Sequence, residues 1–154
     1  MEKRRTHIQL GRLRSIELFD EIDFDKEDEY KYLIESEKVK IVFEKDKPLI
    51  IGLVDNIHCL LIDQYKQGPV FIDFSFLNEN ELIQVADSLA KLGEILSQVN
   101  EIWKGNEDHF SLKKDHATIE HCKKIMRSIG KENPNSDLLF WRYYAFRELE
   151  IDLF

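Results

Sequence analysis

The first half of the chain alternates between apolar and polar residues, which is the period of a half-buried strand. Apolar residues recur at every second position, with one interruption, over residues 16–24, and residues 38–44 alternate β-branched or aromatic residues with charged ones. Two apolar runs, LIIGLV and IHCLLI, flank Asp55 and Asn56, which tolerate the left-handed conformation of a tight turn. After a Gln-Gly-Pro turn signal, the run VFIDFSF at residues 70–76 alternates again. The pattern predicts two strands, then a hairpin, then a further strand.

The spacing of apolar residues changes from two to three or four after residue 77. Asn78 and Glu81 stand where an N-cap and its capping-box partner would stand, and Gly105 stands where a helix would end. We therefore predict a helix over residues 78–103 that packs on the sheet. Its apolar stripe consists of Leu82, Val85, Ala86, Leu89, Leu92, Leu96, Val99 and Trp103.

The pattern in the last third of the chain predicts a second helix. It does not decide between strand and helix for one further segment. Apolar residues recur every three or four positions over residues 115–130, with Gly130 and Pro134 as stop signals. Residues 138–146 fit a strand and a helix, so both stay open, while residues 147–153 alternate and predict a strand. The residues of the second helix that we expect in the core are Ile119, Cys122, Ile125, Met126 and Ile129.

These segments together indicate an α+β protein, with a mostly antiparallel sheet and two main helices packed on one face. The chain has 154 residues, 43% of them hydrophobic, which is enough to bury one stable core without disulfides or metals. The sequence contains no internal repeat, low-complexity segment or linker. We therefore expect residues 1–154 to form a single domain.

The net charge and the cysteine content limit the classes of partner and the cellular compartment that we expect. The chain carries 30 acidic and 22 basic residues, a net charge of −8, and two cysteines that lie far apart. A negatively charged protein repels phosphate backbones, so nucleic acid is a disfavoured partner unless the basic N-terminal residues act as an arm. The longest apolar runs are far shorter than a membrane span, and no apolar core of a signal peptide follows the N-terminus. We expect a cytoplasmic protein with reduced thiols and no membrane partner.

The densest charge lies in the acidic run, residues 20–30 (DEIDFDKEDEY), with seven carboxylates and one lysine. Its acids alternate like the start of an EF-hand calcium loop, but Asp28 takes the place of the required glycine and Ile34 that of the final glutamate. Two hypotheses remain: a solvated loop, and a surface that attracts a basic partner and anchors it with aromatic residues. The predicted partner-binding residues are Asp20, Glu21, Asp23, Phe24, Asp25, Glu27, Asp28, Glu29 and Tyr30.

Motifs for other chemistry are weak. His116, Glu120, His121 and Cys122 in the stretch HATIEHC suggest zinc, but their spacing matches neither H-E-x-x-H nor H-x-x-E-H. An ordinary polar helix face is the better interpretation. His58, inside an apolar run, is interpreted as a core histidine. No nucleophile elbow or glycine-rich phosphate loop is present, so we predict no catalytic residue, no metal and no cofactor.

In size, charge and composition the chain resembles the small, acidic, cytosolic immunity proteins and antitoxins, which neutralise cationic nuclease toxins by covering their active sites. The resemblance implies a non-enzymatic inhibitor that sequesters a basic protein partner. Two alternatives stay open. One is an enzyme whose site is assembled from scattered residues, such as a metal-dependent nuclease using Asp23 and Asp25 with Glu29-Tyr30-Lys31. The other is a structural subunit of a larger assembly. The sequence predicts no oligomeric state.

Overall fold

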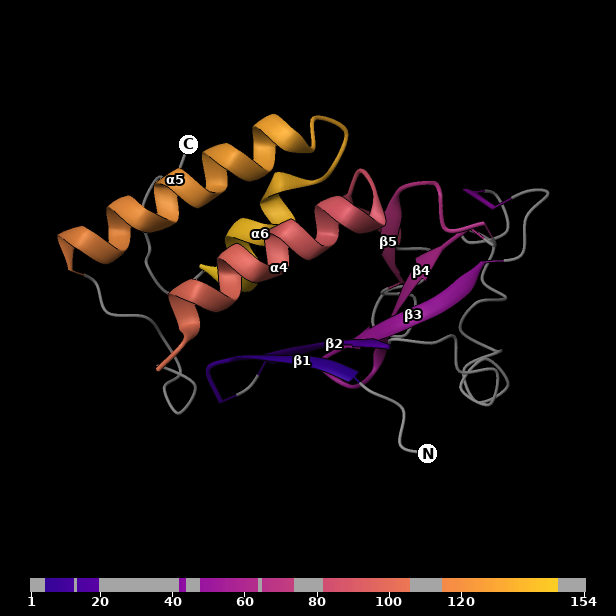
Figure 1. Cartoon of the computed structure of the whole chain (residues 1–154), viewed down its shortest axis with the longest axis horizontal. Coiled ribbons are helices and arrows are strands. Elements are labelled where there is room, and N and C mark those ends of the chain that lie inside the picture. The colour runs from indigo at the N-terminus through magenta and orange to yellow at the C-terminus, as the bar shows by residue number, and fades with distance from the viewer. Residues whose placement is uncertain are drawn as a thin grey trace.

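The structure is a computed structural model that describes residues 5–12, 14–19, 42–43, 48–63, 65–73, 82–105 and 115–146. These residues form a six-stranded antiparallel sheet, whose strands lie side by side in chain order, and three helices on one side of it (Figure 1). The strands are β1 (Arg5–Leu10), β2 (Arg14–Phe19), β3 (Leu49–Val54), β4 (His58–Ile62), β5 (Val70–Asp73) and β6 (Leu82–Ala86). The helices are α4 (Leu89–Trp103), α5 (His116–Glu132) and α6 (Leu138–Ala145). The predicted α+β class is confirmed, and the described residues contain three helices where two main helices were predicted.

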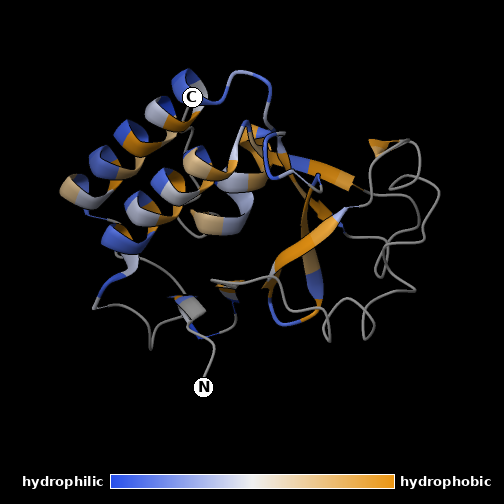
Figure 2. Cartoon of the chain, turned by 45° about the vertical axis from the view of Figure 1, so that its right-hand side comes forward, coloured by the Kyte–Doolittle hydropathy of each residue, from blue (hydrophilic) through white to orange (hydrophobic). Residues whose placement is uncertain are grey.

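The helices form two levels above the sheet. Helix α4 contacts β1 and β6, and α6 contacts β6, whereas α5 makes its main contacts with α4 and α6. Figure 2 shows apolar residues on the inner sides of the helices and hydrophilic residues on their outer sides. Successive strand residues point to opposite faces of a sheet. Leu60 and Ile62 therefore belong to the main core under the helices, while Cys59 and Leu61 belong to a smaller cluster with Phe43.

The predicted hairpin between residues 49 and 62 is confirmed. Strand β3 pairs antiparallel with β4 in a register that places Leu53 opposite Cys59. Asp55 and Asn56 adopt φ angles of 54° and 63° in the turn, the left-handed region that their short polar side chains tolerate. The backbone N–H of Asp55 also donates to the carbonyl of Ser15 at 2.8 Å, so the turn is tied to β2.

The prediction of a helix from residue 78 is wrong for residues 82–86, which form strand β6. Helix α4 begins only at Leu89, where the Ser88 side chain accepts a hydrogen bond from the N–H of Lys91 as N-cap. Strand β6 pairs with β5, and the indole N–H of Trp141 donates to the carbonyl of Val85 at 2.8 Å. Long-range partners therefore decide the conformation of this segment. The proposed cap residues, Asn78 and Glu81, lie outside the described residues.

Two more strand predictions need correction. Strand β1 was not predicted, because only two of its six residues, Ile8 and Leu10, are apolar; it nevertheless pairs with β2 along its whole length. The predicted strand over residues 38–44 is wrong at the two positions that are described, since Val42 is helical and Phe43 lies in a turn. Phe43 is still buried, with its ring centroid 5.6 Å from that of Phe71.

Other predicted segments are confirmed only over part of their length. The strand over residues 16–24 corresponds to β2, which ends at Phe19, and the strand over 70–76 corresponds to β5, which ends at Asp73. The remainder of both segments lies outside the described residues, as does the whole of the predicted strand over residues 147–153.

The predicted second helix is confirmed as α5, but Gly130 does not end it. The helix starts after Asp115, whose side chain accepts from the N–H of Thr118, and continues to Glu132. Asn133 then caps it, donating from its side chain to the carbonyl of Ile129. A Cβ at Gly130 would lie 3.1 Å from a methyl carbon of Leu138, so glycine here allows α6 to approach α5.

The segment over residues 138–146, which the sequence left open, is helix α6 up to Ala145, and a polar clamp holds its C-terminal end. The Arg14 guanidinium donates to the carbonyls of Tyr143 and Tyr144 at 2.8 and 2.6 Å. The Tyr144 hydroxyl lies 2.8 Å from a carboxylate oxygen of Asp55 and 2.9 Å from the carbonyl of Ser15. A positive charge is favourable at the C-terminus of a helix, and a buried hydroxyl is favourable when it is hydrogen-bonded. Both contacts therefore stabilise this arrangement. The clamp joins α6 to the start of β2 and to the β3–β4 turn.

Both cysteines are free and completely buried, which predicts unreactive thiols in the native protein. Burial raises the pKa of Cys59 to about 12, with a further contribution from Asp73, and burial alone raises the pKa of Cys122 to about 12. Only the thiolate reacts, so at pH 8 roughly one thiol in ten thousand would be reactive. We expect the disulfide reagent DTNB to label neither cysteine of the native protein at pH 8, and both once guanidinium unfolds it. Rapid labelling without denaturant would contradict the buried positions.

Candidate functional site

All nine predicted partner-binding residues, in the acidic run, lie outside the described residues. The structure does define the two strands between which the acidic run is inserted. Strand β2 ends at Phe19 and β3 begins at Leu49, and the two strands are antiparallel neighbours with Leu18 opposite Gly52. Turns of two to five residues usually join such neighbours. Residues 20–48 are thus a long insertion between two neighbouring strands.

The charge of the chain is unevenly divided between the described residues and the others. The described residues contain eleven Lys and Arg and eleven Asp and Glu, although the whole chain has 22 basic and 30 acidic residues. The entire net charge of −8 therefore comes from residues outside the described part, and the acidic run is its densest source. The sheet and the helices form a body with balanced charge.

The loop between β4 and β5 presents an aromatic side chain at the end of the sheet where β3 begins. Leu49, which follows the insertion, pairs with Ile62 at the end of β4. The Asp63 carboxylate then accepts from the backbone N–H of Tyr65 at 2.8 Å and of Gly68 at 2.5 Å. A Cβ at Gly68 would lie only 2.7 Å from that carboxylate. This local network leaves Tyr65 67% exposed.

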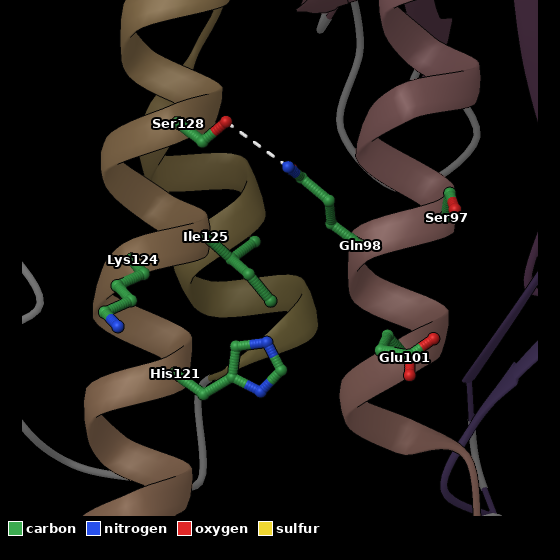
Figure 3. A pocket seen from close by; sticks show the side chains of 7 residues that line it. All are labelled: Ser97, Gln98, Glu101, His121, Lys124, Ile125 and Ser128. Carbon is green, nitrogen blue, oxygen red and sulfur yellow. Dashed lines mark hydrogen bonds between the residues drawn. The ribbon is translucent and has the colours of Figure 1, made fainter.

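Helices α4 and α5 flank a groove that is lined by residues of both helices. Its volume is about 440 Å³ (Figure 3). His121 and Ile125 project from α5 toward α4, and Glu101 lies opposite His121 on α4. The Gln98 amide donates to the Ser128 hydroxyl at 3.3 Å and bridges the two helices at one end. The lining residues are Ser97, Gln98, Glu101, His121, Lys124, Ile125 and Ser128.

Periodicity alone did not reveal this groove. In the sequence, His121 stands out only as part of a possible zinc motif, and no motif contains Glu101. The two residues are twenty positions apart, and only the packing of α4 against α5 brings them to one groove. The sequence signal for such a groove is a run of polar residues on each helix between the positions that face the core.

The structure supports an ordinary polar helix face for the stretch HATIEHC. His116 and His121 are exposed, whereas Cys122 is buried in the main core. The Glu120 carboxylate forms an ion pair with Lys123 at 3.6 Å. Within the described ranges, no three His, Cys, Asp or Glu side chains are grouped so that they could hold a metal ion.

His58 is a core residue, as interpreted from the sequence, with only 3% of its surface exposed. Burial lowers its pKa, and the negative charges of Asp55 and Asp73 oppose that shift in part. A lowered pKa favours the neutral imidazole at physiological pH. His58 thus belongs to the interior of the sheet and lies apart from the groove between α4 and α5.

The comparisons with known proteins identify no relative: no family model, curated protein or solved structure matches the chain. Among the described helices, none is long and apolar enough to cross a membrane. The class that the structure defines is an α+β fold with a long acidic insertion and a helix–helix groove. Functional inference therefore rests on the residues of this chain.

Proposed function

We propose that the chain is a binding protein that sequesters a basic protein partner, in the manner of an immunity protein or antitoxin. One observation carries the proposal: the described body has balanced charge, while the acidic run is inserted between two paired strands of the sheet. A concentrated negative potential steers basic partners and raises their association rate. The two flanking strands anchor both ends of the insertion to the body.

The loop that carries Tyr65 supports the same proposal, because it supplies an exposed aromatic at the sheet end where the insertion starts. Binding energy concentrates in a few Tyr, Trp and Arg anchors, whereas rim charges act mainly on association. The Asp63 hydrogen bonds hold the loop in one conformation, so less entropy is lost on binding. Phe24 and Tyr30 in the acidic run are the further anchors predicted from the sequence.

The test begins with affinity capture of the partner from cells that produce this chain, followed by binding kinetics with the purified pair. In a triple variant, Asp23, Asp25 and Asp28 are replaced by Asn. We expect its association rate constant to be roughly tenfold lower at low salt, because steering weakens when the charge is removed. The difference should shrink above about 0.15 M salt, where the screening length is near 8 Å. Tyr65→Ala should instead speed dissociation.

A charge-matched control removes three acids from the helices. Surface ion pairs contribute little to stability, so this control should fold and bind like the original protein. Its substitutions are Glu94→Gln, Glu120→Gln and Glu132→Gln. If both triple variants associate equally fast at low salt, the acidic run is a solvated loop and the proposal is wrong. The proposal also fails if the captured partner is acidic.

A further inference from the structure

The two edges of the sheet differ in how the described residues cover them. Strand β6 forms one edge, where the backbone N–H of Asp137 donates to the carbonyl of Gln84 at 2.8 Å. The indole N–H of Trp141 donates to the next carbonyl along this edge, that of Val85. Strand β1 forms the other edge, and β2 is its only partner among the described strands (Figure 1). Such an edge presents a row of backbone N–H and C=O groups that can pair with a further strand.

Strand β1 is regular enough to accept a further strand. All six of its residues pair with β2 without a bulge, and none of them is a proline, so two common devices that blunt an edge are absent from β1. Ile8 and Leu10 belong to the main core under the helices, whereas His7, on the opposite face, is exposed. A strand beside β1 therefore needs apolar residues toward the helices and polar residues on the other face.

Residues 147–153, for which the sequence predicts a strand, have this pattern, because leucine or isoleucine alternates with an acid. The apolar members are Leu149, Ile151 and Leu153, and the acidic members are Glu148, Glu150 and Asp152. Residues 3–5, by contrast, are Lys-Arg-Arg. Opposite charges on neighbouring strands favour pairing, whereas a second copy of β1 would bring only further basic residues to this edge. The charge pattern therefore favours the C-terminal segment over a second copy.

The end of α6 lies near the end of β1 from which such a strand would start. Arg14 is the partner of Leu10 in the β1–β2 pairing, and its guanidinium donates to the carbonyl of Tyr144 at 2.6 Å. The Trp103 indole, at the end of α4, donates to the carbonyl of Ala145 at 3.0 Å, and α4 contacts β1. The segment that follows α6 thus leaves the helix near the Leu10 end of β1, where an antiparallel partner of β1 begins.

The length of the segment is sufficient to reach the open edge. The Tyr144 carbonyl lies one arginine side chain away from β2. Neighbouring strands are about 5 Å apart, so a strand outside β1 lies about 10 Å from β2. An extended chain of five residues, from Tyr144 to Leu149, spans about 17 Å. Leu149 can therefore lie opposite Leu10.

We propose that residues 147–153 pair with the open edge of β1 as a further antiparallel strand. With Leu149 opposite Leu10, the apolar residues of both strands lie on the side of the helices, and Asp152 lies opposite His7. The added strand hides the edge, which keeps two copies of the chain from joining their sheets. The acidic run is inserted between β2 and β3, so this proposal does not rest on the proposed function.

A disulfide tests the pairing in the full chain. In the proposed register Gln9 lies opposite Glu150 on the face away from the helices, and the Cα atoms of opposite residues are about 5 Å apart, within the range of a disulfide. We expect Gln9→Cys combined with Glu150→Cys to form an intramolecular disulfide in most molecules on mild oxidation. Gln9→Cys combined with Leu149→Cys is the matched control, because its second thiol lies on the opposite face. Mass spectrometry of non-reduced peptides distinguishes these links from any with the buried Cys59 and Cys122.

Removal of residues 147–154 tests the protection of the edge. We expect the backbone amides of β1 that do not pair with β2 to exchange with deuterium at least roughly tenfold faster, because their partners are lost. The amides of β4, which lies between two strands, should exchange at the original rate. Light scattering should show that the shortened chain associates at concentrations at which the full chain does not.

The proposal is overturned if the Gln9–Glu150 pair forms no disulfide, or if it forms one no more readily than the Leu149 control. A disulfide that links two chains would overturn it as well, since a second copy would then occupy the edge. So would unchanged exchange of β1 in the shortened chain. The disulfide needs no truncation and decides the proposal even if the shortened chain unfolds. None of these outcomes affects the kinetic test of the acidic run.

Discussion

We expect Leu96→Asp to abolish folding. Leu96 is 2% exposed and lies in the main core, which joins the sheet and the three helices. A buried charge without a partner costs several kcal/mol of stability. Loss of the apolar contacts of a core leucine costs about 2–5 kcal/mol more. Native domains are stable by only about 5–15 kcal/mol. The variant should lack a cooperative thermal transition by circular dichroism.

Asn100→Asp is the matched control, because Asn100 is exposed on the same helix and the substitution adds the same charge. Surface substitutions of this kind change stability by only about 0.5 kcal/mol or less. The control should therefore melt near the temperature of the original protein. A cooperative transition of Leu96→Asp at that same temperature would show that α4 does not bury Leu96 in the main core.

We expect Gly52→Ala to destabilise the protein by about 3 kcal/mol, the upper end of the usual cost of overpacking. A Cβ at this position would lie 2.1 Å from the carbonyl oxygen of Glu17 on the neighbouring strand, and 3.2 Å from the Cα of Leu18. Both atoms belong to the backbone of β2, so the two strands would have to separate. Gly52 also adjoins the register shift in the pairing of β3 with β4.

Gly93→Ala is the opposite case and serves as the control. Gly93 is exposed inside α4, and a Cβ there would meet no atom within 4 Å. Alanine in place of a helical glycine stabilises the folded protein by roughly 0.5–1 kcal/mol, because the unfolded chain with alanine has fewer conformations to lose on folding. Thermal melts should move in opposite directions, down by roughly 6–12 °C for Gly52→Ala and up by roughly 1–4 °C for Gly93→Ala. A stabilised Gly52→Ala would contradict the close approach of β2 and β3.

Part of the candidate site was readable from the sequence, and part was not. The acidic run, the polar nature of HATIEHC and the core position of His58 follow from residue type and neighbours. The exposed Tyr65 and the groove between α4 and α5 do not. Tyr65 is presented by a loop whose shape depends on the Asp63 hydrogen bonds. The groove requires two helices to pack side by side, and periodicity describes only one helix at a time.

By itself, the sequence determined the α+β class, the hairpin between β3 and β4, and helix α5, because each has a strong local pattern with a suitable turn or cap. Tertiary structure decided the segments whose local patterns were ambiguous. Residues 82–86 form a strand because β5 pairs with them and Trp141 donates to Val85. Residues 138–145 form a helix because Asp137 caps it, α5 packs on it and Arg14 binds its last carbonyls. Such partners lie up to 130 positions away along the chain, so no local period contains them.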